Sequence, residues 1–221
     1  MVSPGVKVKG LPIAHEGGRQ LEYLCNGYVS WLVMLATVLF LYVTDVFDIA
    51  TVIDNLGSIM TVAILWGDLF ALGIYFGAFL TNNQHEVQGN FFYDYFMGVW
   101  LNPRFLGVDL KLFVETRVWV NLFLLTLAAA VRQYQELGEI TFSIGFMVLA
   151  HGFIYANSVM KGEECIPTTW DIFKEKFGWM LIYWNLAGVP FVYCFSSMYI
   201  LNNDPAEFHV LYKVALIVVI L

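Results

Sequence analysis

Long apolar stretches alternate with short polar segments along this chain. Five stretches are long enough to matter, and they run from Leu24 to Thr44, Leu56 to Leu80, Trp119 to Val131 with the amphipathic turn before it, Thr141 to Met160, and Gly178 to Leu201. About 20 apolar residues in a helix cross the hydrocarbon of a bilayer. The stretches are continuous and lack the alternation of barrel strands. They predict an all-α fold, a polytopic integral membrane helical bundle with five spans.

A sixth apolar run starts near His209 and reaches Leu221, which is too short to cross a bilayer. We therefore expect the chain to be an amino-terminal fragment of a larger protein. No repeat or composition shift marks a second domain, so residues 1–221 are predicted to form one membrane domain, with 1–23 as its amino-terminal segment. That segment lacks the features of a cleaved signal peptide.

The basic residues sort to one side of the predicted spans. Nine of the eleven fall in the amino-terminal tail and in the loops after the second and fourth spans, namely Lys7, Lys9, Arg19, Arg104, Lys111, Arg117, Lys161, Lys174 and Lys176. Only Arg132 and Lys213 fall on the other side. Because short cytoplasmic loops are enriched in Lys and Arg, the amino terminus is predicted to be cytoplasmic.

Composition supports a lipid bilayer as the surrounding solvent. The chain is 59% hydrophobic and 13% charged, whereas soluble domains have about 45–50% apolar and about 25% charged residues. The net charge of −7 argues against nucleic acid as a partner. Three scattered cysteines show neither a C-x-x-C pair nor zinc spacing, so no metal site is predicted.

Several polar or helix-breaking residues lie inside the predicted spans. Asp68 is open to two interpretations, a place in a substrate or proton path and a hydrogen bond that pairs helices. His151 has no metal-ligating neighbour at helical spacing, which favours a hydrogen-bonded core histidine. Asn185 and Pro190 interrupt the fifth span, which predicts either a cavity-lining break or a packed kink.

Two loops carry unusual residues at fixed spacing. The first contains Gly89, Tyr93, Asp94, Gly98, Leu101, Asn102, Pro103 and Arg104, and the second contains Glu163, Glu164, Thr168, Thr169 and Asp171. The Thr168 to Asp171 segment fits a helix-capping pattern. For Glu163, Glu164 and Asp171, an ordinary solvated loop face is the alternative to a functional role.

The first loop resembles the signature of the sterol reductase family, which includes sterol C-14 and C-7 reductases, the lamin B receptor membrane domain and fungal C-24(28) reductases. The second loop, continued by Trp184-Asn185-Leu-Ala-Gly188 and Tyr193, is similar to the fungal C-24(28) branch. The resemblance extends from about Gly10 onward.

The resemblance implies NADPH-dependent reduction of the C-24(28) double bond of a sterol in the endoplasmic reticulum membrane. It implies Tyr193 as proton donor. Asp68, a carboxylate inside a span, is a second catalytic candidate, and Trp184 and Asn185 are candidate substrate-binding residues. The NADPH site is expected mostly beyond Leu221. We therefore expect this chain alone neither to bind NADPH well nor to turn over.

Other functions remain open from the sequence. Within the family, the substrate double bond could be C-14 or C-7. Outside enzymes, the chain could be a non-catalytic sterol-binding protein, or a transporter that uses Asp68 and the interrupted fifth span. Other sterol-biosynthetic enzymes are possible partners.

Overall fold

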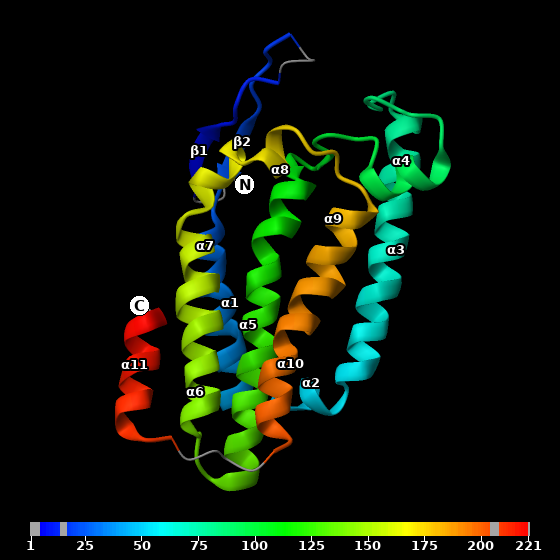
Figure 1. Cartoon of the computed structure of the whole chain (residues 1–221). Coiled ribbons are helices and arrows are strands. Elements are labelled where there is room, and N and C mark those ends of the chain that lie inside the picture. The colour runs from blue at the N-terminus through cyan, green and yellow to red at the C-terminus, as the bar shows by residue number, and fades with distance from the viewer. Residues whose placement is uncertain (1–4, 14–16, 204–207, 221) are drawn as a thin grey trace.

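Helices form most of the chain, as the apolar stretches predict (Figure 1). The computed structural model describes residues 5–13, 17–203 and 208–220, so Leu221 lies outside the described residues. In chain order the elements are β1 (Val6–Lys9), β2 (Glu22–Cys25), α1 (Gly27–Val43), α2 (Thr51–Asp54), α3 (Leu56–Leu80), α4 (Phe91–Met97), β3 (Arg104–Phe105), β4 (Val108–Asp109), α5 (Leu110–Leu137), α6 (Phe142–Val148), η2 (Leu149–Ala156), α7 (Asn157–Lys161), η3 (Glu163–Thr168), α8 (Trp170–Phe173), α9 (Trp179–Tyr183), η4 (Trp184–Gly188), α10 (Val189–Leu201) and α11 (Val210–Ile220).

The described residues include four helices that are long and apolar enough to cross a membrane. They are α3, α5, the continuous helix α6–η2–α7 and the continuous helix α9–η4–α10. The first predicted span is the 17-residue α1, and the sixth apolar run forms the 11-residue α11. The predicted polytopic helical bundle is confirmed.

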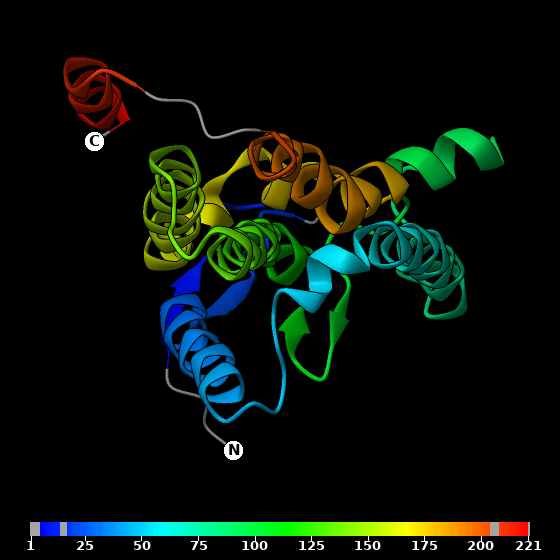
Figure 2. The ribbon, with the colours of Figure 1, turned by 90° about the horizontal axis from the view of Figure 1, so that it is seen from below.

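Helix α5 lies at the centre of the bundle (Figure 2). It packs against α10, α6, η2 and α2, and Leu122 and Ala128 are almost fully buried. The prediction that this span begins near Trp119 was wrong, because the helix begins at Leu110, where the Asp109 carboxylate caps it by accepting the Leu112 N–H at 3.0 Å. Lys111 and Arg117 therefore lie on a helix, not in a loop.

Two of the spanning helices contain π-helical turns, η2 and η4. Pro190 is the second residue of α10, which follows η4 directly, and it is buried, as is Asn185. Proline removes one backbone hydrogen bond, and a π-turn is one way for a helix to absorb that loss. The structure therefore favours the packed kink over a cavity-lining break.

One end of the bundle carries the two small antiparallel sheets, β1–β2 and β3–β4, together with α4, η3 and α8 (Figure 1). These strands were not predicted, because they have only two to four residues, too few to show alternation. The basic tail and both basic loops gather here. We call it the polar end.

The opposite end of the bundle is acidic, and polar contacts hold its loops. Arg132 forms an ion pair with Asp54, and Gln135 donates to Asp48 at 2.8 Å. That hydrogen bond, with one from the Ala50 N–H, lowers the pKa of the Asp48 carboxyl. These contacts join the loop after α1 to the last turns of α5.

Candidate functional site

The amide of Asn102 joins three segments that are far apart in the sequence. Its Nδ2 donates to the Tyr23 hydroxyl at 3.2 Å, to the Ile172 carbonyl at 3.2 Å and to the Asp109 carboxylate at 3.4 Å. β2, the start of α5 and α8 therefore meet at this signature residue. Pro103 continues the turn, and its carbonyl accepts the Leu110 N–H at 2.9 Å.

Arg104 packs against the same cluster from outside. Its guanidinium donates to the Glu22 carbonyl at 2.7 Å, lies 5.2 Å from the centre of the Tyr23 ring, and approaches the Asp109 carboxylate at 3.6 Å. Burial raises the pKa of the Asp109 carboxyl, and the Leu112 N–H and Arg104 partly offset that rise. Burial and the charge of Asp109 also raise the pKa of the Tyr23 phenol.

Lys111 is fully buried beneath this cluster. Its ammonium donates to two backbone carbonyls, Ile172 at 2.8 Å and Glu175 at 2.6 Å. A buried ammonium is tolerated only when its donors are satisfied. Lys111 therefore fixes the loop that contains α8 against the start of α5.

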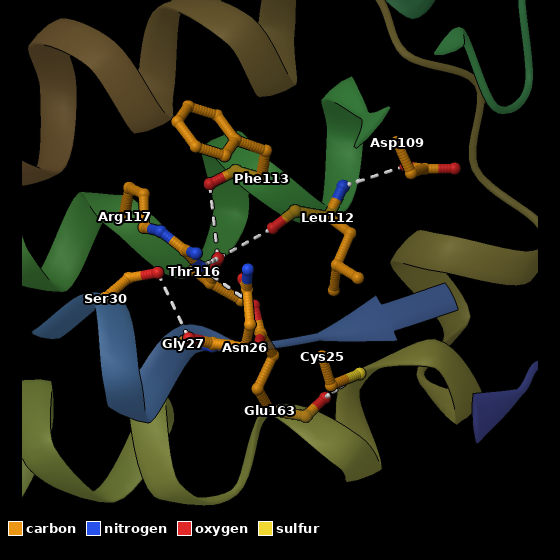
Figure 3. Close-up of polar contacts among 10 residues, drawn as sticks. All are labelled: Cys25, Asn26, Gly27, Ser30, Asp109, Leu112, Phe113, Thr116, Arg117 and Glu163. Atoms are coloured by element: carbon orange, nitrogen blue, oxygen red, sulfur yellow. Dashed lines mark hydrogen bonds and ion pairs between the residues drawn. The ribbon is translucent and has the colours of Figure 1, made fainter. Parts of the chain in front are cut away.

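Glu163 closes the other side of the polar end (Figure 3). Its Oε2 accepts the Gly27 N–H at 2.5 Å, and its Oε1 accepts from Arg117 at 2.8 Å. A Cβ on Gly27 would lie 2.8 Å from Oε2, so a larger residue there would displace the carboxylate. Glu163 is 4% exposed, and the interpretation of this residue as part of a solvated face was wrong.

The thiol of Cys25 lies next to that carboxylate and donates to the Glu163 carbonyl at 3.8 Å. Burial, with the charges of Glu163 and Glu164, raises the pKa of the thiol to about 11. The thiol is therefore protonated near neutral pH and acts here as a small buried group.

A cavity of about 210 Å³ opens between β2, the β3–β4 hairpin and α5. Its charged lining consists of Glu22, Arg104, Asp109, Arg117 and Glu163. Both arginines already form ion pairs with carboxylates of the chain. Sites for drug-sized ligands have volumes of about 300–1,000 Å³, which is larger than this cavity. The cavity does not fit a dinucleotide such as NADPH.

The first half of the signature shapes the loop after α3. Asp94 is 1% exposed and accepts the N–H groups of Gln88 and Gly89 at 2.9 and 3.0 Å. Gly98 has φ of +90°, and a Cβ there would lie 2.5 Å from the Gly178 nitrogen. These residues set backbone geometry, whereas the Tyr93 side chain is half exposed.

The second loop does not form the helix cap that the sequence predicts. Thr168 and Thr169 donate backward, to the carbonyls of Cys165 at 2.7 Å and Ile166 at 2.8 Å, and neither side chain caps α8. The capping prediction was wrong because η3 offers these hydroxyls its own free carbonyls. Glu164, Thr169 and Asp171 are exposed.

The structure does not bring the two catalytic candidates together. Asp68 accepts the indole N–H of Trp179 at 2.7 Å and so pairs α3 with α9. Tyr193 lies fourteen residues further along the same helix, roughly 20 Å at 1.5 Å per residue. The two side chains therefore cannot reach one reacting bond, and the role of Tyr193 stays a prediction.

The substrate-binding candidates also separate. Asn185 is buried, and its Nδ2 donates to the Leu181 carbonyl at 2.8 Å within the π-turn, whereas Trp184 is 48% exposed. The core interpretation of His151 is confirmed, because its Nδ1 lies 2.7 Å from the Thr126 hydroxyl.

Sequence reasoning missed Tyr23, Asp109 and the buried role of Lys111. One signal was available for the last. Lys111 and Glu115 are four apart in a segment that precedes a span, the spacing of neighbours on one helix face. Tyr23 offered no such signal, because its partners are about 80 residues away in the sequence.

Comparison with known proteins shows a family model and several relatives that this chain is similar to. The family model described as "Ergosterol biosynthesis ERG4/ERG24 family" matches residues 1–221. The Delta(24(24(1)))-sterol reductase erg4A of Aspergillus fumigatus is 44% identical over 208 residues, which cover 93% of this chain and 44% of the relative.

Two further relatives show the same partial coverage. The Delta(24(24(1)))-sterol reductase of Gibberella zeae is 45% identical over 204 residues, 91% of this chain and 34% of the relative. The Delta(14)-sterol reductase of Dictyostelium discoideum is 38% identical over 224 residues, 99% of this chain and 47% of the relative. The chain thus spans less than half the length of each.

Proposed function

Because the chain belongs to the ergosterol biosynthesis ERG4/ERG24 family, we propose that it takes part in reducing the C-24(28) double bond of a sterol. The observation that carries this choice is the identity of 44% and 45% to two fungal Delta(24(24(1)))-sterol reductases, against 38% and 37% to two Delta(14)-sterol reductases. The apolar spans support a substrate that enters from the membrane, where sterols dissolve.

We further propose that the polar end faces the cytoplasm in the endoplasmic reticulum membrane. The support is the distribution of charge, since nine of eleven basic residues belong to segments at this end. Cytoplasmic loops carry such an excess. The amino terminus would then be cytoplasmic.

For the chemistry, we propose that Tyr193 protonates the alkene. An unactivated alkene must gain a proton before it accepts a hydride, and a phenol has an O–H group that can donate one. The Tyr193 side chain is 50% exposed on α10, so a molecule in the membrane can reach it. Asn185 would act as a positioning residue, because it holds the π-turn beside Trp184.

The resemblance implies NADPH as the hydride donor. The cavity at the polar end does not fit this cofactor, so we assign it to no residue of this chain. The polar end instead fixes the loops, with Asp94, Asn102, Lys111 and Glu163 all held by hydrogen bonds.

The test is sterol analysis in a yeast strain that lacks C-24(28) reduction. One arm expresses this chain, and a second expresses a chimera in which it replaces the matching segment of the Aspergillus fumigatus relative. We expect the chimera to restore the saturated side chain and Tyr193→Phe to reduce that product at least tenfold, with Tyr199→Phe, an exposed tyrosine on the same helix, as control. An inactive chimera that folds and inserts would contradict the proposal.

The alternative within the family is reduction at C-14 or C-7. Feeding the same chimera sterols with a single double bond at C-24(28), C-14 or C-7 separates these activities. Loss of only the C-14 double bond would assign the chain to the other branch.

A further inference from the structure

A groove of about 470 Å³ runs along the membrane-spanning part of the bundle, between α1 and the continuous helix α6–η2–α7. Figure 2 shows α5 behind these helices, in the middle of the bundle. Trp31 and Phe123 form the buried floor, with ring centroids 5.2 Å apart in an edge-to-face arrangement. Because these helices cross the membrane, any occupant of the groove comes from the lipid phase.

The floor is flat because a glycine lies over an aromatic ring. A Cβ on Gly152 would lie 2.2 Å from the Phe123 ring, so no larger residue can occupy this position without moving the ring. Gly152 belongs to the π-turn η2, and π-turns are frequent at functional sites. The groove therefore presents a smooth surface suited to a rigid, flat molecule.

Two hydrogen-bonding groups lie near one end of the groove. The Trp31 side chain is 4% exposed, yet its indole N–H donates to no group in the part of the chain that the structure describes. Asn157 also lines the groove, and its side-chain amide forms no hydrogen bond with the described residues. Since Trp31 packs against Ala156 and Met160, the two groups lie at the same level. The indole nitrogen is not fully buried, so it can still donate to a partner from outside the described residues.

The rest of the lining is apolar, and none of its residues is charged. A phosphate headgroup would find no cation here, whereas a single hydroxyl could accept from Trp31 and bond to Asn157. From Asn157 to Gly145 the groove follows twelve residues of helix, about 18 Å at 1.5 Å per residue. Half the hydrocarbon of a bilayer is about 15 Å thick, so the occupant is one leaflet long.

We propose that this groove binds one sterol, with its hydroxyl between Trp31 and Asn157 and its fused rings on the Phe123–Gly152 floor. A rigid ring system loses little conformational entropy on binding, which favours it over a flexible chain of the same length. No lining residue is titratable, so this site supplies no proton for a reaction. It is a second, non-catalytic sterol site, and it does not depend on the proposed reduction.

The test is photolabelling of the 221-residue chain in phosphatidylcholine nanodiscs with a diazirine sterol that keeps its hydroxyl. We expect mass spectrometry to find labelled peptides from α1 and from residues 145–157. Gly145→Leu should lower this labelling at least fivefold, because a Cβ there meets only Ile140 at 3.9 Å and the new side chain can fill the groove without a clash. Gly73→Leu, at a position in α3 with nothing within 4 Å, is the matched control and should label normally.

Hydroxyl recognition is tested separately. Asn157→Leu should weaken labelling by roughly three- to tenfold, the value of one neutral hydrogen bond. On the unmodified protein, an unlabelled sterol should compete, whereas a sterol without the hydroxyl and an octadecyl alcohol should not.

Unchanged groove labelling in Gly145→Leu would overturn the proposal. Equal competition by octadecyl alcohol would also overturn it, because the groove would then bind acyl chains in general. Neither readout requires turnover. Failure of sterol reduction therefore leaves this test intact, and the reverse also holds.

Discussion

Replacing Glu163 by glutamine should destabilise the whole polar end. The carboxylate accepts from Gly27 at 2.5 Å and from Arg117 at 2.8 Å. Glutamine keeps the shape, but its NH₂ group must face one of these two donors, and the Arg117 charge loses its partner. Removing one member of a buried ion pair costs about 3–5 kcal/mol.

The Arg117 side chain is 18% exposed, so water can partly replace the lost carboxylate, and we expect a loss of roughly 2–4 kcal/mol. For a chain of this size, 1 kcal/mol shifts the unfolding temperature by about 2–4 °C. The predicted decrease is therefore about 4–16 °C. Glu164→Gln makes the same chemical change at an exposed neighbour and should cost no more than about 0.5 kcal/mol.

The assay is thermal unfolding in detergent micelles, followed with a thiol-reactive fluorescent maleimide in a Cys165→Ser background. Cys25 and Cys194 are buried and react only on unfolding, and Cys25 lies beside Glu163. If Glu163→Gln unfolds at the same temperature as the parent, or if Glu164→Gln causes an equal decrease, the ion pair does not stabilise the polar end as we argue.

Three further predictions follow from backbone geometry and burial. Gly98→Ala should lower the free energy of unfolding by about 3 kcal/mol or more, because φ is +90° and the new methyl would clash with the backbone at Gly178. Gly89→Ala is the control, since Gly89 has φ of +78° with nothing within 4 Å, and it should cost only about 1 kcal/mol. Thermal unfolding measures both. Leu106→Asn should raise the free energy of unfolding by about 1 kcal/mol. Leu106 is 88% exposed and has φ of +51° in a two-residue hairpin turn, a conformation that favours Asn. An equal gain from Leu106→Ala would show that φ is not the cause. The pKa of the folded Cys25 thiol is raised from 9.0 to about 11, so the unfolded state releases this proton first. Stability should therefore fall more between pH 9 and 11 in the parent than in Cys25→Ala, which keeps the contribution of the buried Tyr23 phenol.

The helices were predictable because about 20 consecutive apolar residues have few alternatives to a membrane span. The early start of α5 was not, because Lys111, Glu115 and Arg117 read as a loop. The charges of Lys111 and Arg117 are tolerated in a helix through partners 46 to 64 residues away. The π-turns were also hidden, since the sequence shows Pro190 but not how its neighbours absorb the missing hydrogen bond.

For the candidate site, the resemblance pointed to loop positions but not to the contacts that they make. Asn102, Arg104 and Glu163 converge at one end, as loop residues of a common signature could be expected to do. Their contacts with Tyr23, Gly27 and Ile172 depend on tertiary packing, which no local pattern shows. The separation of Asp68 from Tyr193 likewise followed from one hydrogen bond to Trp179.

The long-range contacts of Asn102 impose an order on biosynthesis. Tyr23 leaves the ribosome well before Ile172, another acceptor of this amide, which lies 149 residues further along the chain. At about 5–20 residues per second, translation of that interval takes roughly 7–30 s. During this time the amino-terminal hairpin lacks the part of its docking surface that η3 supplies, and its Cys25 thiol lacks the Glu163 carbonyl as a partner. The burial of this thiol therefore marks the moment when the nascent chain has passed the fourth span.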